Sequence, residues 1–154
     1  MCSSDEIVHR LIAGDAEVVG ALEVRYGTTD RAEIARIVFV DPDELRWLEA
    51  LLHPRVRREY GKWLDRLDGS ADVAVVEIPL LYETGGEELF DIVVVVTAPE
   101  DVRVARAGEK VVERSARLLP DEVKARRAHY AYVNDGSLAE LESFVGHVLD
   151  ELRA

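Results

Sequence analysis

Residues 91–97 read Asp-Ile-Val-Val-Val-Val-Thr, and residues 72–79 read Asp-Val-Ala-Val-Val-Glu-Ile-Pro. Both are continuous β-branched runs, the pattern typical of strands that are buried on both faces of a parallel sheet. We expect these two strands to form the centre of the sheet. A shorter run at 130–133, Tyr-Ala-Tyr-Val, predicts a third strand, and a helical pattern follows over 137–152. Helix and strand alternate, which indicates an α/β fold.

The first half of the chain has a helical pattern. Apolar residues recur there at three-to-four spacing, which predicts three amphipathic segments around residues 7–12, 18–22 and 34–38. A fourth segment runs from Pro42 to about Leu52. We expect His53-Pro54 to start a fifth helix, because proline suits the first helical turn, where no amide donor is needed.

Composition and charge restrict the possible functions. A chain of 154 residues that is 48% hydrophobic and 32% charged predicts one domain over 1–154. The net charge of −12 opposes general binding to nucleic acid or to anionic membranes. The only cysteine, Cys2, cannot form an internal disulfide, and no Cys/His spacing predicts a metal site, which favours the cytoplasm. The longest strongly apolar stretch, 92–96, is too short to span a bilayer.

Three polar segments follow the predicted strands. They are Glu77-Ile-Pro-Leu-Leu-Tyr-Glu83, Thr97-Ala-Pro99 and Asn134-Asp-Gly136. The carboxyl ends of parallel strands point into the crevice where open α/β sheets bind ligands. Ordinary turn chemistry explains any one of these segments alone, but their occurrence together favours a ligand site.

Five short motifs follow one another along the chain. They are Ser3-Ser-Asp-Glu-Ile7, Leu51-Leu-His-Pro54, Glu77-Ile-Pro-Leu-Leu-Tyr-Glu83, Val95-Val-Thr-Ala-Pro-Glu100 and Val133-Asn-Asp-Gly-Ser-Leu138. In this order and spacing they resemble the motifs of dephospho-coenzyme A kinases. The resemblance implies a P-loop kinase-like parallel sheet flanked by helices, with a helical acceptor-substrate region at about 14–70 and a lid at about 103–127. It also implies transfer of the γ-phosphate of ATP to the 3′-hydroxyl of dephospho-coenzyme A, with Mg²⁺, in the last step of coenzyme A biosynthesis.

The resemblance also implies roles for individual residues. Asp5 would be the general base, although Ser3 stands where the family has the first Asp of an Asp-x-Asp pair. A helix cap formed by Ser3 and Glu6 is the structural alternative for this segment. Arg106 and Arg114 would contact the ATP phosphates, and Asn134 and Gly136 would border the adenine. The expected acceptor-side residues are His53, Pro79, Leu81, Tyr82 and Glu83.

Basic residues cluster in one segment of an otherwise acidic chain. Residues 103–127 hold eight basic and four acidic side chains. On one continuous helix a single stripe would contain Arg103, Arg106, Lys110, Arg114 and Arg117. We interpret the stripe as a phosphate-binding lid. The alternative is a solvated helix face, and Gly108 either interrupts the helix or acts as a hinge.

The family's Gly-rich phosphate loop has no counterpart in the sequence. The resemblance places a strand, this loop and a helix before Ser3, and we expect the chain to start after them. The pair Gly61-Lys62 is not a displaced loop, because Val56 and Trp63 occupy positions that need glycine and Ser/Thr, and it predicts a helix interior. Without the loop we expect little or no phosphoryl transfer by the 154-residue chain. Two alternatives stay open: a non-catalytic ligand-binding or regulatory descendant, and another nucleoside or nucleotide kinase.

Overall fold

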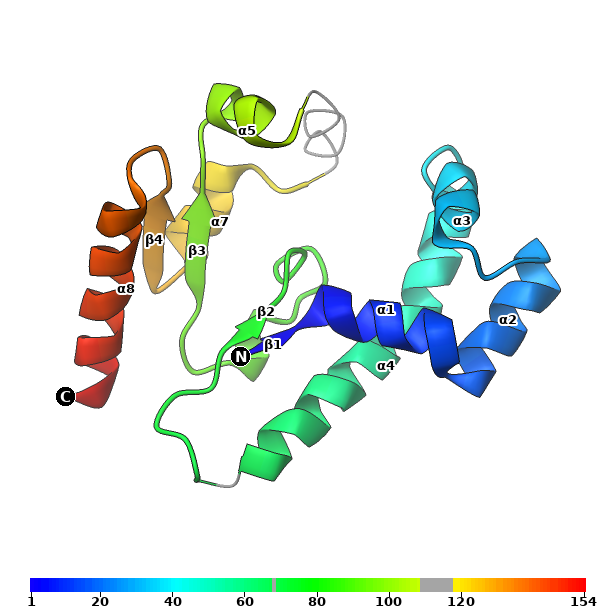
Figure 1. The fold of residues 1–154 in the computed structure, drawn as a ribbon, viewed down its shortest axis with the longest axis horizontal. Helices are drawn as coiled ribbons and strands as arrows, with labels where there is room; N and C mark the ends of the chain where they lie inside the picture. The colour runs from blue at the N-terminus through cyan, green and yellow to red at the C-terminus, as the bar shows by residue number, and fades with distance from the viewer. Residues whose placement is uncertain (68, 109–117) are drawn as a thin grey trace. The chain divides into compact units, whose positions relative to one another are not determined.

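The computed structural model describes residues 1–67, 69–108 and 118–154, and the chain divides into two compact units, 1–79 and 80–154 (Figure 1). The first unit contains β1 (Cys2–Ser3), α1 (Ser4–Gly14), α2 (Ala16–Tyr26), α3 (Arg31–Val38), α4 (Pro42–Leu67) and β2 (Val76–Glu77). The second contains η1 (Glu87–Leu89), β3 (Val94–Thr97), α5 (Glu100–Ala107), α7 (Asp121–Arg127), β4 (Tyr130–Val133) and α8 (Leu138–Arg153).

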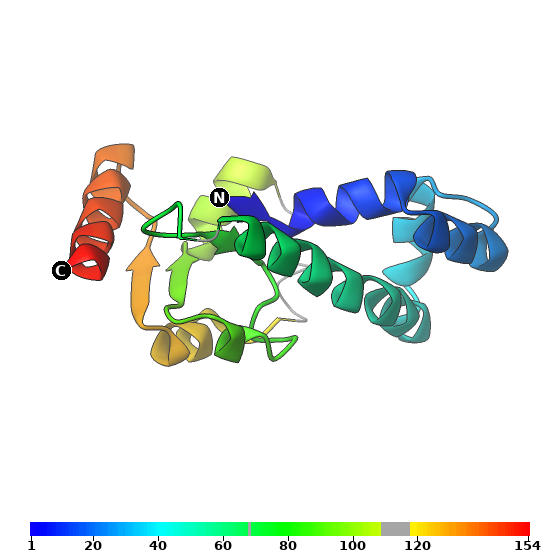
Figure 2. The ribbon, with the colours of Figure 1, turned by 90° about the horizontal axis from the view of Figure 1, so that it is seen from below.

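The first unit is held by a helical core. Helix α1 packs on α2 and along α4, and α3 packs on α4 (Figures 1 and 2). The buried apolar side chains of these helices are Ile7, Leu11, Ile12, Val18, Leu22, Ile34, Val38, Leu52, Val56 and Tyr60. Those on α1, α2 and α3 occupy positions that the three-to-four spacing predicts, so the amphipathic pattern of these three segments is confirmed.

The helix boundaries follow from local capping. Asp15 caps α2 by accepting the amides of Glu17 and Val18, and Asp30 caps α3 through Glu33. Helix α2 ends at Gly27, whose φ of 70° is a left-handed conformation that glycine adopts without strain. Each predicted break in the helical pattern therefore has a side-chain or backbone cause.

The predicted fourth and fifth helices form one helix, so the prediction that His53-Pro54 starts a new one was wrong. Helix α4 continues from Pro42 to Leu67 with Pro54 inside it. A proline in a helix interior removes one backbone hydrogen bond. Nearby, the Arg55 guanidinium donates to the Leu51 carbonyl at 2.8 Å. The pair Gly61-Lys62 lies inside α4, as predicted.

Each unit contains one short parallel sheet. Strand β1 pairs with β2, and β3 pairs with β4, each in parallel. The prediction of two long strands buried on both faces was wrong. Strand β2 has two residues, and on β3 the side chains of Val94 and Val96 are 42% and 52% exposed. Strand β4 at 130–133 matches its prediction, and α8 nearly matches the predicted helix.

Aromatic contacts fasten α8 to β4 in the second unit. The rings of Tyr132 and Phe144 stack with centroids 4.8 Å apart, and the Tyr130 hydroxyl donates to Glu151 at 2.6 Å. Helix α7 contacts both β3 and β4 (Figure 1). These contacts position the carboxyl ends of β3 and β4.

Candidate functional site

The carboxyl ends of β3 and β4 bring together two of the predicted ligand segments. The register pairs Thr97 with Val133, and the Asn134 amide donates to the Thr97 carbonyl at 2.7 Å. Parallel strands present their carboxyl ends at one edge of a sheet, where ligands of α/β proteins bind. The segments Thr97-Ala-Pro99 and Asn134-Asp-Gly136 therefore form one polar edge.

Arg106 reaches this edge from α5. Its guanidinium Nη1 donates to the Asn134 carbonyl at 3.2 Å. An arginine side chain has five N–H donors, so the exposed guanidinium keeps donors for a further acceptor. The structure thus places a predicted phosphate-binding residue next to a predicted adenine-bordering residue.

Gly136 has a structural reason to be glycine. Ser137 caps α8 and forms a capping box, in which Glu140 accepts from the Ser137 amide at 2.6 Å and from its hydroxyl at 2.8 Å. A Cβ on Gly136 would overlap Glu140 Oε2. These hydrogen bonds from Ser137, the backbone one first, hold the pKa of Glu140 below its ordinary value. Any larger residue at 136 would therefore make the end of the Glu140 side chain shift away from the cap.

Residues 80–86 form one helical turn with a Schellman ending. The Gly86 amide donates to the Leu81 carbonyl at 3.0 Å, and the Gly85 amide donates to the Tyr82 carbonyl at 3.3 Å. This is the bond pattern of the motif, and Gly85 supplies the left-handed residue with a φ of 61°. The sequence signal was the pair Gly85-Gly86, which sequence reasoning did not use.

The Glu83 carboxylate contacts two groups of its own unit, the Lys124 ammonium and the backbone amide of Leu119. Its Oε1 lies 2.6 Å from Lys124 Nζ and accepts the Leu119 amide at 3.1 Å. Burial raises the pKa of Glu83, but hydrogen bonds from Lys124 and from the backbone amides of Glu83 and Leu119 outweigh burial and lower it overall. Glu83 is therefore an ionised partner of Lys124.

Tyr82 is also covered by α7. Its side chain is 7% exposed, and the Arg127 guanidinium lies 4.5 Å from the centre of its ring. Arg127 also pairs with Glu87. Sequence reasoning missed Lys124 and Arg127 as partners of the predicted acceptor segment, although their i,i+3 spacing on α7 places them on one helix face.

The remaining predicted acceptor residues are His53, Pro79 and Leu81. His53 is half-buried on α4, and burial lowers its pKa. Pro79 is exposed at the end of the first unit, and Leu81 is half-buried in the second. The predicted acceptor set is thus divided between the two units, and only Leu81, Tyr82 and Glu83 belong to one turn.

Asp5 lies in the first turn of α1, immediately after β1, and its side chain is exposed. The register of β1 and β2 pairs Ser3 with Glu77, so an exposed second carboxylate ends the neighbouring strand. Ser3 makes no side-chain cap bond, so the alternative of a capping box with Glu6 was wrong. The conformation of α1 leaves Asp5 accessible to a ligand.

The basic stripe is only partly within the described residues. Lys110, Arg114 and Arg117 lie outside them, while α5 ends at Ala107 and Gly108 has a φ of 81°. Each described basic residue of 103–127 contacts an oxygen of its own unit. The contacts are Arg103 with Asp121, Arg106 with Asn134, Lys124 with Glu83, Arg126 with Glu122, and Arg127 with Glu87. Of the two stripe residues described, Arg103 is ion-paired, whereas Arg106 bonds only a neutral backbone carbonyl.

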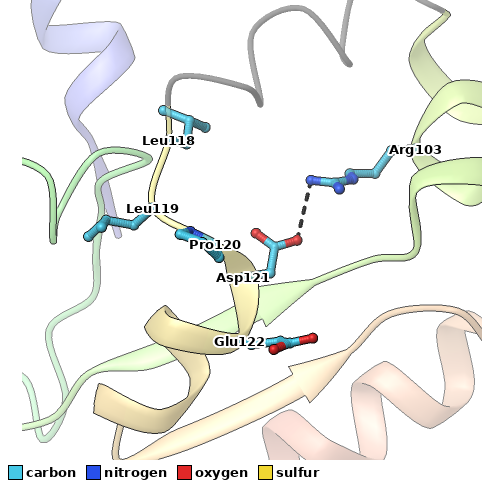
Figure 3. A pocket seen from close by; sticks show the side chains of 6 residues that line it. All are labelled: Arg103, Leu118, Leu119, Pro120, Asp121 and Glu122. Atoms are coloured by element: carbon cyan, nitrogen blue, oxygen red, sulfur yellow. Dashed lines mark ion pairs between the residues drawn. The ribbon is translucent and has the colours of Figure 1, made fainter.

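A hollow of about 240 Å³ lies beside Arg103 (Figure 3). It is lined by Arg103, Leu118, Leu119, Pro120, Asp121 and Glu122. Arg103 Nη1 lies 3.3 Å from Asp121 Oδ2, and the buried Arg103 Nε has no hydrogen-bond partner among the described residues. Sequence reasoning placed Arg103 in the basic stripe but missed its partner Asp121.

Neither a metal centre nor a membrane span occurs in the part of the chain that the structure describes. No cluster of three or more His, Cys, Asp or Glu side chains there could hold a metal ion. No described helix combines the length and the apolar character needed to cross a bilayer.

Comparisons with known proteins agree on one family. Residues 5–140 match the family model described as CoaE, dephospho-CoA kinase. A dephospho-CoA kinase of Mesorhizobium japonicum is 40% identical over 162 residues, covering 97% of this chain and 82% of that protein. One of Thermus thermophilus is 42% identical over 133 residues, covering 82% of this chain and 64% of that protein.

Solved structures share the fold. The crystal structure of TT1252 from Thermus thermophilus matches with a TM-score of 0.79 and 38% identity, covering 98% of this chain and 83% of that one. Dephospho-CoA kinase from Campylobacter jejuni matches with a TM-score of 0.69 over the same shares, at 24% identity, which shows the fold alone. These likenesses confirm the predicted α/β class. The chain belongs to the dephospho-coenzyme A kinase family, a family of ATP-dependent kinases.

Proposed function

We propose that the chain binds ATP and dephospho-coenzyme A for transfer of the γ-phosphate to the 3′-hydroxyl, in the cytoplasm. The observation that carries the proposal is the contact of Arg106 with Asn134 at the joined ends of β3 and β4. It supports a nucleotide site there, with Arg106 toward the phosphates and Asn134 and Gly136 toward the base. Because the protein as a whole is acidic, an anionic ligand needs a cation close to its binding site, and Arg106 is such a cation at this edge.

Asp5 is the proposed general base. A carboxylate within hydrogen-bond reach of the 3′-hydroxyl takes its proton as the oxygen attacks the γ-phosphorus, while the bond from that phosphorus to the β,γ-bridging oxygen breaks and ADP leaves. Such general-base catalysis typically contributes ~10²–10⁴-fold. Asp5 is exposed and fixed in the first turn of α1, so it can approach a bound hydroxyl. His53, Pro79 and Leu81 are the proposed acceptor contacts, together with the turn that carries Tyr82 and Glu83.

Mg²⁺ is the proposed metal, bound to the triphosphate. The described residues do not form a metal-binding cluster of their own. The remaining proposed phosphate contacts are Lys110, Arg114 and Arg117. Backbone amides of a Gly-rich loop normally cradle the β- and γ-phosphates, and the 154 residues do not contain one.

A non-catalytic role as a ligand-binding protein is the second candidate. It is favoured by the ion pairs of Arg103, Lys124 and Arg127, which leave less free positive charge for a triphosphate. The two candidates share ligand binding and differ in whether a residual turnover that depends on Asp5 is present.

The test measures binding and turnover separately. Calorimetric titration of the 154-residue chain with dephospho-coenzyme A is expected to show binding, and a coupled ADP assay is expected to give turnover far below the ~1–100 s⁻¹ of ordinary kinases. Asp5→Asn should lower any turnover by ~10²–10⁴-fold. Glu6→Gln, an exposed neighbour, is the matched control. Absence of binding refutes the proposal, and turnover at an ordinary rate refutes the dependence on the loop.

A further inference from the structure

We infer that Glu83 is a positioning residue that acts through Lys124, and that it is not itself a ligand of the acceptor. The inference rests on the proposed function, in which the turn at 80–86 lies on the acceptor side. It assigns to Lys124, which sequence reasoning did not single out, a role in acceptor binding.

One carboxylate oxygen joins the turn to two points on another segment. Glu83 Oε1 contacts Lys124 Nζ and accepts the Leu119 amide. The side chains of Glu83 and Lys124 are 17% and 12% exposed, so the ion pair is largely shielded from water. Separating the two partners of a shielded ion pair is costly, because each would be left as an uncompensated charge. The pair therefore keeps its geometry.

Tyr82 also contacts α7, the helix that carries Lys124. Arg127 lies over its ring, one helical turn after Lys124 on the same face of α7. Two consecutive residues of the turn are therefore held by two residues of one helix face. The Schellman ending at Gly85 and Gly86 fixes the backbone between them and the following segment.

The ion pair of Glu83 with Lys124 determines which groups the turn can present to an acceptor. Dephospho-coenzyme A carries a diphosphate, so a free carboxylate on its binding turn would repel it. Lys124 compensates the charge of Glu83. With Tyr82 and Glu83 both directed to α7, the turn can offer the acceptor its backbone and Leu81, while α7 fixes the shape of the turn.

The test compares single and double variants by calorimetric titration with dephospho-coenzyme A. Lys124→Gln leaves the Glu83 carboxylate uncompensated near the diphosphate and should raise the dissociation constant about tenfold, whereas Glu83→Gln, which frees the Lys124 cation, should raise it less. The double variant should be no weaker than Lys124→Gln, since both changes remove one coupling. Lys124→Arg keeps the cation and should retain most of the affinity. Glu88→Gln, exposed in the same segment, and Arg126→Gln, exposed on α7, are the controls and should stay within about twofold.

The outcomes separate the inference from the proposed function. Binding by the unchanged chain, with Glu83→Gln weakened and Lys124→Gln unaffected, makes Glu83 a direct ligand and overturns the inference alone. Additive losses in the double variant overturn it as well. No binding by the unchanged chain overturns the proposed function, and the inference with it. Far-ultraviolet circular dichroism on each variant identifies loss of folding, and a Glu83→Gln/Lys124→Gln pair that folds while its singles do not supports the coupling.

Discussion

Arg106 and Asn134 meet through a side-chain to backbone hydrogen bond, although 28 positions separate them in the chain. The contact links α5 to the end of β4. There the backbone amide of Asn134 also donates to the Thr97 carbonyl and extends the hydrogen-bond ladder between β3 and β4. A nucleotide at this edge would meet the guanidinium and the strand end together.

A titration with MgATP tests this edge directly. We expect backbone amide NMR shifts at Asn134, Gly136 and Arg106, and we expect Arg106→Ala to weaken binding by roughly tenfold, as for loss of a charged hydrogen bond. Arg126→Ala on α7 removes the same charge from an exposed pair and should leave the titration unchanged. Equal effects of the two variants would show that only net charge matters.

Gly136→Ala should disrupt the cap of α8. The added Cβ overlaps Glu140 Oε2, so the carboxylate must leave the Ser137 amide and hydroxyl. We expect amide hydrogen exchange in the first turn of α8 to become roughly two- to tenfold faster. In a Glu140→Ala background the same change should add nothing, because the clashing group is gone. A full additional loss in that background contradicts the explanation.

The secondary structure was predictable where a local signal decides it. Strand β4 was predicted at its observed bounds because Asn-Asp-Gly follows the alternating run. Pro54 misled the prediction, since a proline at a helix start and one inside a continuous helix have the same local sequence. The valine runs showed that these segments could form buried strands. Actual burial depends on which elements cover the strand, and Val94 and Val96 are exposed.

The site was predictable only in its strand-end segments. Thr97 and Asn134 were found because parallel strands end at one edge. The partners of Glu83 could not be predicted, since Lys124 lies 41 positions away in the chain and the spacing of residues around it does not indicate an acidic partner. Pairing across elements is set by tertiary packing, so the sequence predicts free charge at Arg103, which the structure pairs with Asp121.

His129→Phe should loosen the start of the β3–β4 ladder. The buried Val93 donates its amide to His129 Nδ1 at 3.0 Å, and phenylalanine keeps the ring but removes the acceptor. We expect a loss of about 0.5–1.5 kcal/mol in the free energy of unfolding and faster exchange of the Val93 amide. His147→Phe is the control, because that imidazole is 67% exposed and lies 3.4 Å from Glu151. An unchanged Val93 exchange rate would contradict the prediction.

His53 should make the first unit less stable in mild acid. Burial lowers its pKa below the ordinary 6.5, Glu49 opposes this and Arg57 adds to it. The unfolded chain therefore binds the proton at a higher pH than the folded chain, so the free energy of unfolding falls as the pH drops below about 6.5. Urea unfolding followed by the fluorescence of Trp47 and Trp63, both on α4, reports this unit.

The variant His53→Gln should flatten that dependence between about pH 7 and pH 5.5. Carboxylates with lowered pKa values, such as Glu44 and Glu59, lose their contribution only below their ordinary 4.5, outside this window. The control His9→Gln changes an exposed histidine of α1 and should keep the slope. A slope that persists in His53→Gln assigns the acid sensitivity to another group.

We expect the chain to self-associate through β3, and Val96→Lys should weaken that association. Val94 and Val96 project from one face of β3, and both are exposed, so the strand offers a small apolar surface to a second molecule. The lysine makes that surface costly to bury, and we expect the association constant from sedimentation velocity to fall by roughly tenfold or more. Val24→Lys is the matched control, because Val24 is 90% exposed on α2. Both variants reduce the net charge of −12 and hence the mutual repulsion of the chains, so a fall in association specific to Val96→Lys must come from the β3 surface.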